Sequence, residues 1–302
     1  MLTRRRFLAI SAVMALPAAA RAAPPLHIAT GQALGAQVTL RLAHPEAPAI
    51  AARAMAEIAR LEDVFSLYRP SSALMRLNVS GVLEAPPFDL LECLTLAGQV
   101  HAASGGRFDP TVQPLWSLQA ETASRGRAPD AAELADARAR TGWHRLRIEA
   151  GEIRLDPGMA LTLNGIAQGY IADRVTDLLR AEGLGDILID TGEMRALGGD
   201  PRGGDWPVRL QDGGTVSLRD RALATSGTLG TTFDAAGMRG HILDPVTGNP
   251  ARPVWRAVTI AAPSAALADA LSTAACLMQD RADITALCDR FAETAALSLV
   301  PL

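Results

Sequence analysis

Hydrophobic residues recur along this chain with two different spacings, and the spacing predicts which segments are helices and which are strands. From Pro48 to Phe65 apolar residues recur every three or four positions, which places them on one side of a helix. Residues 34–42 alternate with a period of two, which is typical of a strand with one buried face. The same reasoning predicts further helices at residues 86–104, 119–142, 166–182 and 265–278, and further strands at residues 146–148, 153–155, 187–190, 207–210, 215–218, 258–261 and 295–300.

The order of these elements indicates the fold class. Strands and helices do not follow the strict alternation that a doubly wound parallel sheet requires, and residues 146–155 read as an antiparallel hairpin. No internal repeat, low-complexity stretch or linker divides the chain. We therefore expect an α+β fold with mixed or antiparallel sheets and packed helices, formed by residues 23–302 as one unit.

The first 22 residues have the composition of a secretory signal. A basic region from Thr3 to Leu8 precedes an apolar stretch at residues 9–20, and Ala20-Arg21-Ala22 provides a cleavage site with small residues. The apolar stretch is too short to span a bilayer, which takes roughly 20 residues. Paired arginines before Phe-Leu indicate the twin-arginine export route, with an ordinary arginine-rich signal peptide as the alternative. We expect a periplasmic protein that starts near Ala23 and has no transmembrane segment.

Charge and cysteine content exclude several classes of function. The whole chain has a formal net charge of −3, and residues 1–22 carry four arginines and no acid, so the exported form has −3 less four positive charges, or −7. An acidic protein of this kind has no electrostatic footprint for nucleic acid or anionic lipid. Every basic residue is an arginine, which excludes a Schiff-base lysine and a P-loop lysine. The three cysteines form no CxxC pair, so neither a disulfide framework nor a thiolate metal site is expected.

Three clusters of glycine and polar residues lie where turns are expected. The first contains Tyr68, whose ring could stack on a planar ligand or lie at the edge of the core. The second spans residues 105–116 and contains Asp109 in Asp-Pro-Thr, where a purely structural turn explains the residues equally well. The third joins residues 163–170 to residues 190–193. Its glycine-rich entry into a helix could present N–H groups to a pyrophosphate, but the spacing is not that of a Rossmann fold.

A fourth cluster combines residues 224–228 and 240–248 with the helix that contains residues 268–273. Asp269 and Thr273 are four residues apart, so their oxygens lie on one helical face. A carboxylate and a hydroxyl, with water and phosphate oxygens, suit Mg²⁺. Alternatively Asp269 interacts with the helix dipole and Thr273 fills space. His241 is likewise open to two interpretations, a base or a surface residue.

Taken together and in this order, these segments resemble the ApbE family of FAD:protein FMN transferases. The resemblance covers the chain from Gly31 to about Leu297. Its most specific parts are residues 106–112 (GRFDPTV), 164–170 (NGIAQGY), 225–227 (TSG), 241–248 (HILDPVTG) and 268–274 (ADALSTA). Each motif alone is weak evidence, but five motifs in register are specific. The resemblance implies an ApbE-like flavin transferase domain over residues 23–302.

The resemblance also implies a role for each candidate residue. Asp269, Thr273 and the backbone carbonyl of Ala167 would bind Mg²⁺, and His241 would help to deprotonate the acceptor hydroxyl. Tyr68 would lie against the isoalloxazine of FAD. The other expected FAD-binding residues are Asp109, Gln168, Glu193, Ser226, His241 and Asp244. A threonine hydroxyl of a partner flavoprotein, periplasmic or membrane-bound, would attack the FMN-side phosphorus of FAD and release AMP.

The chain departs from the family pattern next to the expected metal site. Most relatives carry Lys in Gly-Ile-Ala-Lys-Gly, where this chain has Gln168, and Asn164 replaces a frequent Gly or Asp. A cation near the pyrophosphate is then lost, and an arginine elsewhere could replace it. Glutamine at this position with a twin-arginine leader resembles the NosX-like branch, which is associated with nitrous-oxide reductase maturation. In that branch the acceptor would be a membrane-bound flavoprotein with a periplasmic FMN-binding domain.

Two other functions are compatible with the same residues. A metal-dependent FAD pyrophosphatase would use water as the nucleophile in the same pocket and give FMN and AMP. A non-enzymatic periplasmic flavin carrier or maturation factor would bind FAD without cleaving it, which the loss of the lysine makes plausible.

Overall fold

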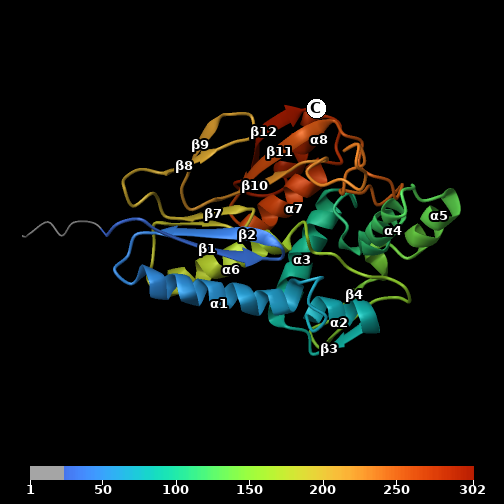
Figure 1. Cartoon of the computed structure of the whole chain (residues 1–302), viewed down its shortest axis with the longest axis horizontal. Coiled ribbons are helices and arrows are strands. Elements are labelled where there is room, and N and C mark those ends of the chain that lie inside the picture. Colours follow the sequence, from blue (N-terminus) through green and yellow to red (C-terminus); the bar gives the residue numbers. More distant parts are fainter. Residues whose placement is uncertain (1–23) are drawn as a thin grey trace, which may run out of the picture.

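A seven-stranded antiparallel sheet forms the centre of the computed structural model, which describes residues 24–302 (Figure 1). The strands follow the order β1-β2-β6-β7-β10-β11-β12, and every neighbouring pair is antiparallel. Their bounds are His27–Ala33 (β1), Ala36–Leu42 (β2), Ile187–Asp190 (β6), Met194–Leu197 (β7), Ala222–Ser226 (β10), Trp255–Ala262 (β11) and Ala295–Pro301 (β12). The predicted α+β class is confirmed. The predicted signal segment lies outside the described residues.

Eight α-helices accompany the sheets within the described residues, and three of them cover one face of the large sheet. Helices α1, α6 and α7 contact β1, β7 and β10 respectively. The helices are α1 (Ala47–Phe65), α2 (Ala73–Ser80), α3 (Phe88–Ala103), α4 (Gln113–Ser124), α5 (Ala131–Ala139), α6 (Ala167–Ala181), α7 (Ala265–Ala275) and α8 (Arg281–Cys288), with short 3-10 turns at Pro110–Val112 and Trp143–Arg145. None of them is long and apolar enough to cross a membrane.

Alternation along the strands separates two cores. In β6, Ile187 and Ile189 belong to the main core beneath the helices, while Leu188 belongs to a smaller core on the opposite face. That smaller core is closed by a hairpin of β8 (Trp206–Arg209) and β9 (Thr215–Leu218), through the buried ring of Trp206. The third sheet contains β3 (Val82–Glu84), β5 (Glu152–Arg154) and β4 (Arg147–Ile148), and its β4–β5 pair is the predicted hairpin.

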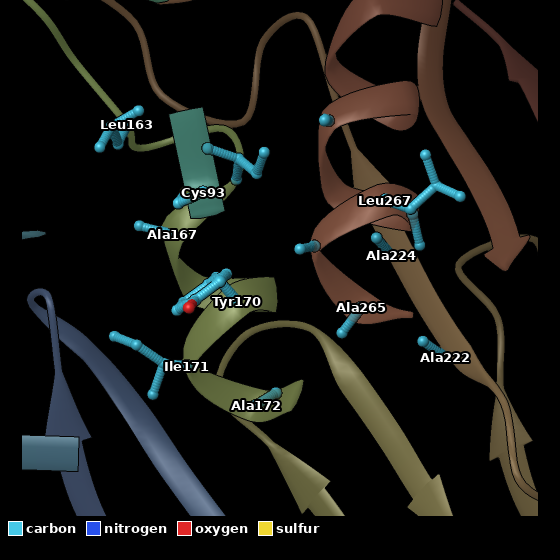
Figure 2. Close-up of a cluster of buried hydrophobic side chains, with 14 of the residues drawn as sticks. Cys93, Leu163, Ala167, Tyr170, Ile171, Ala172, Ala222, Ala224, Ala265 and Leu267 are labelled. Carbon is cyan, nitrogen blue, oxygen red and sulfur yellow. The ribbon is translucent and has the colours of Figure 1, made fainter. Parts of the chain in front are cut away.

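Close packing of α6 against α7 positions the residues of the candidate site. A Cβ added to Gly169 would lie 2.3 Å from the carbonyl oxygen of Ala265, so only glycine permits this approach. Figure 2 shows Ala265 facing α6, and Ala222 and Ala224 of β10 beside α7. Small side chains therefore let α7 pack tightly between α6 and the sheet.

Two sequence predictions were wrong in extent. The strand predicted at residues 34–42 begins only at Ala36, because Leu34 and Gly35 have φ values of 50° and 85° and turn the chain back from β1 into β2. Residues 119–142 do not form one helix. Gly126, with a φ of 72°, follows the end of α4, and Asp130 begins α5 with a capping box that includes Glu133. The elements α2, α8, β1, β3, β7 and β10 were not predicted.

Candidate functional site

The predicted motifs converge on one cavity of about 340 Å³. Its walls come from the turn after α3, the entry into α6, the turn between β6 and β7, the end of β10, the loop before β11, and α7. The candidate residues that line it are Asp109, Gln168, Glu193, Ser226, His241, Asp269 and Thr273. The structure thus brings together seven candidate side chains from segments far apart in the sequence.

The hydroxyl groups of β10 and α7 form a continuous polar edge in this cavity. The Ser226 Oγ lies 2.7 Å from the Ser272 Oγ and 3.3 Å from the Thr273 Oγ1. A Cβ added to Gly165 would lie 2.9 Å from the same Thr273 oxygen. Glycine at position 165 therefore lets the backbone entering α6 come close to the Thr273 hydroxyl. Leu163 and Ala167, on either side of Gly165, are labelled in Figure 2.

Asp269 and Glu193 place two carboxylates in this cavity that are almost completely buried. Asp269 is 3% exposed and Glu193 is 7% exposed. Asp269 accepts a long hydrogen bond of 3.4 Å from the backbone N–H of Gly169, and Glu193 accepts one of 3.2 Å from the N–H of Thr225. Within residues 24–302, no arginine forms an ion pair with either carboxylate.

The pKa values of both carboxylates reflect this environment. Burial raises the pKa of Asp269 to about 8, against the hydrogen bond from Gly169, and the charge of Asp173 raises it further. Burial, followed by the charge of Asp269, raises the pKa of Glu193 well above its usual value. Two buried carboxylates that repel each other favour a bound cation, because a cation would offset both burial and repulsion.

The donor set in the cavity fits a hard cation such as Mg²⁺. The Asp269 carboxylate, the Thr273 hydroxyl and the neighbouring Ser226 hydroxyl are all oxygen donors. Between residues 24 and 302, no group of three His, Cys, Asp or Glu side chains gathers in a metal-binding cluster. An ion here would therefore also need backbone, water or phosphate oxygens. Ala167 is buried in the first turn of α6. Its side chain is a methyl group, so it could contribute only its backbone carbonyl, and this predicted role stays a prediction.

His241 is held in one tautomer. Its Nδ1 lies 3.0 Å from the carbonyl oxygen of Thr231. Since a carbonyl can only accept, Nδ1 carries the proton and Nε2 of the neutral ring has a free lone pair. Burial lowers the pKa of His241, and the bond to Thr231 partly opposes this effect. The ring is therefore neutral and basic at neutral pH.

Three candidate residues either lie outside the cavity lining or have a carboxylate that is already hydrogen-bonded within a turn. Tyr68 follows α1, is 71% exposed and is not among the residues that line the cavity. Asp244 also lies outside the lining, and its carboxylate accepts hydrogen bonds from the Val246 N–H and the Thr247 hydroxyl, which close a turn. Asp109 lines the cavity, but its Oδ1 also accepts bonds from the Thr111 N–H and hydroxyl. The FAD-binding roles of these residues stay predictions.

Several lining residues were not singled out from the sequence, among them Arg107 and Trp116. Arg107 and Trp116 both belong to the motif after α3 and both reach the cavity. The sequence signal that could have identified them is their position in the same motif as Asp109. Arg107 is the only arginine or lysine among the residues of the described chain that line this cavity.

Comparisons with known proteins point to one family. The model of the ApbE family matches residues 34–297. A Treponema pallidum protein named FAD:protein FMN transferase is 33% identical over 294 residues, which cover 82% of this chain and 79% of that protein. A Vibrio cholerae protein of the same name is 29% identical and covers 91% of this chain and 88% of its own length.

Solved structures give the same result. The apo form of the flavinyl transferase ApbE of Pseudomonas stutzeri superposes with a TM-score of 0.80 at 28% identity, covering 93% of this chain and 95% of that chain. The apbe protein of Thermotoga maritima superposes with a TM-score of 0.82 at 26% identity, covering 91% and 94%. The fold of residues 24–302 therefore agrees with both of these structures along most of its length.

Proposed function

The chain belongs to the ApbE family, and on that premise we propose that it transfers FMN from FAD to a threonine hydroxyl of an acceptor protein. It is an FAD:protein FMN transferase by its similarity to the named relatives and solved structures. The finer parts of the proposal are the threonine acceptor, the requirement for Mg²⁺ and the release of AMP. The main support for them is that His241, with a free Nε2, lines the same cavity as the buried Asp269 and the partly buried Thr273.

The proposed reaction is a phosphoryl substitution that balances without a redox partner. The threonine Oγ forms a bond to the FMN-side phosphorus of FAD, and the bond from that phosphorus to the oxygen shared with AMP breaks. The threonine proton leaves with the base, and AMP departs with the shared oxygen. The acceptor then carries FMN as a phosphate ester of its threonine.

His241 is the proposed base. Its Nδ1 proton is engaged by the Thr231 carbonyl, so the ring has one free acceptor, Nε2, and a fixed orientation. Its lowered pKa keeps the ring neutral at pH 7, as a proton acceptor requires. A positioned base of this kind typically contributes a rate factor of about 10²–10⁴.

Asp269 and Thr273 are the proposed metal ligands, together with the backbone carbonyl of Ala167. When bound, Mg²⁺ would neutralise charge on the diphosphate and on the leaving AMP. The protein supplies the cavity. Burial raises the pKa of the Asp269 carboxyl there, so a bound cation would stabilise its ionised form.

The proposed place of action is the periplasm. Support comes from the composition of residues 1–22, with an arginine-rich start, a short apolar stretch and a cleavage site. The acceptor would be a periplasmic or membrane-bound flavoprotein, and the glutamine at position 168 favours the NosX-like branch. Fractionation of cells that express the full chain tests this location, and retention of the uncleaved chain in the cytoplasm would contradict it.

Transfer is tested by incubating the purified protein with FAD, Mg²⁺ and a candidate FMN-binding domain. We expect the intact mass of the domain to rise by one FMN less one water, and fragmentation to locate the flavin on a threonine. An unmodified domain beside free FMN would indicate an FAD pyrophosphatase. FAD that is bound and never cleaved would indicate a carrier.

A further inference from the structure

Carboxylates outnumber permanent cations in the wall of the cavity. Asp109, Glu193 and Asp269 line it, whereas Arg107 is the one arginine among the lining residues of the described chain, and the sequence has no lysine. A dinucleotide diphosphate brings two further negative charges. A divalent metal bound by the ionised Asp269 carboxylate would offset only part of the negative charge of this carboxylate and the diphosphate together. Arg107 is therefore the side chain available to contribute further positive charge.

The turn after α3 places Arg107 in the wall of the cavity. Gly105 and Gly106 have φ values of 63° and 81°, which reverse the chain at the end of the helix. The reversal is closed by hydrogen bonds from the Gly105 N–H to the Ala102 carbonyl and from the Gly106 N–H to the His101 carbonyl. Arg107 follows at once and Asp109 comes two residues later, so both residues line the cavity directly after this turn.

The guanidinium of Arg107 is held in place but is not neutralised. Its Nη1 donates a hydrogen bond of 3.1 Å to the carbonyl of Ser104, which restrains the side chain. Arg107 is exposed, and no carboxylate of residues 24–302 forms an ion pair with it. Half of the other exposed arginines of the described chain form an ion pair, as Arg127 does with Glu133. A restrained arginine with several unused N–H donors at a cavity matches the geometry of a phosphate oxygen.

We infer that Arg107 binds the diphosphate of FAD and supplies the cationic side chain of this active site. The inference rests on the proposed use of FAD and adds a binding residue to it. Gln168 lines the same cavity, with its amide against Gly192, but has no charge. A lysine at position 168 would bring a positive charge into the cavity from α6. A lysine at position 168 should therefore compensate for the loss of the positive charge at position 107.

Equilibrium binding tests this inference without any transfer step. The ligands are FAD and riboflavin, which has no phosphate, measured with the full mature chain at a fixed Mg²⁺ concentration. The variants are Arg107→Gln, Arg107→Lys and the double variant Arg107→Gln with Gln168→Lys. Arg76→Gln is the matched control, because Arg76 is exposed on α2, does not line the cavity and changes the net charge equally.

We expect Arg107→Gln to weaken FAD binding by about 10- to 100-fold, the range for a hydrogen bond between charged groups, and to leave riboflavin binding unchanged. Arg107→Lys should be intermediate, the double variant should regain much of the lost affinity, and Arg76→Gln should bind as the wild type does. Equal FAD affinity of the wild type and Arg107→Gln would overturn the inference and leave the proposed function standing. Equal loss of FAD and riboflavin binding would also overturn it, as a general effect on the site. A wild-type protein that does not bind FAD at all would overturn both.

Discussion

The carboxylate of Asp173 accepts a hydrogen bond of 2.8 Å from the backbone N–H of Ala265, so that a side chain of α6 caps the first turn of α7. A second bond of 2.9 Å comes from the N–H of Ala266, and the Nε of the buried Arg195 lies 3.2 Å from the same carboxylate. This cap fixes the position of α7, and α7 carries both proposed side-chain ligands of the metal, Asp269 and Thr273. Stability and the geometry of the site therefore depend on one carboxylate that lies outside the cavity.

Replacing Asp173 by alanine should lower the free energy of unfolding by about 2 to 3 kcal/mol, because two backbone N–H groups and the buried Arg195 lose their partner. Chemical denaturation at pH 8 measures this, since burial raises the pKa of Asp173 to about 6 and the carboxylate is ionised there. Asp177→Ala is the control, because Asp177 is half exposed and pairs with Arg180 on the surface. Equal effects of the two substitutions would contradict the capping role.

Replacing Gly169 by alanine should destabilise the protein by about 3 kcal/mol and separate α6 from α7. The physical reason is the 2.3 Å that would remain between the new Cβ and the Ala265 carbonyl oxygen. Thermal unfolding measures the loss. Gly185→Ala is the matched control, since nothing lies within 4 Å of its Cβ position. A wild-type melting temperature for Gly169→Ala would contradict the close approach of α6 to α7.

Much of this arrangement could be predicted from the sequence. The three- and four-residue spacing predicted α1, α3, α6 and α7, and the same spacing predicted that Asp269 and Thr273 share a helical face. Strand β10 was not predicted, because it ends in Thr225 and Ser226, two polar residues that line the cavity and interrupt the apolar pattern. A strand that supplies an active site loses the composition by which strands are recognised.

Other parts of the site depend on contacts that no local pattern contains. The tautomer of His241 is set by the carbonyl of Thr231, ten residues earlier in the chain, which the fold of the loop brings within 3.0 Å. The burial of Glu193 depends on how β7 and β10 pair. Motif spacing could therefore identify the residue types at the site but could not establish their protonation or orientation.

Replacing Asp269 by asparagine should abolish both the stabilisation by Mg²⁺ and the Mg²⁺-dependent release of AMP. In the wild type, Mg²⁺ at about 100 times its dissociation constant should add about 2.7 kcal/mol to the free energy of unfolding. Thermal shift with and without Mg²⁺ measures this directly. Asp283→Asn on the exposed side of α8 should respond to Mg²⁺ as the wild type does. An unchanged Mg²⁺ response in Asp269→Asn would place the ion elsewhere.

The rate of transfer should fall as the pH drops through the pKa of His241, because the base acts only in its neutral form. Burial lowers that pKa from its ordinary value of 6.5, so kcat/KM should be level above pH 6.5 and decline only below it. Replacing His241 by glutamine should reduce kcat by about 10²–10⁴ and remove this decline. His27→Gln in β1 serves as the control. A decline that persists in His241→Gln would assign the titration to another group.

In the proposed reaction a hydroxyl of a protein, and not water, accepts the FMN. The most direct measurement follows AMP and flavin-labelled acceptor together during one reaction with FAD and Mg²⁺. AMP should form only when the acceptor is present and in an amount equal to the labelled acceptor. Formation of AMP with free FMN at the same rate when the acceptor is left out would contradict the proposed reaction.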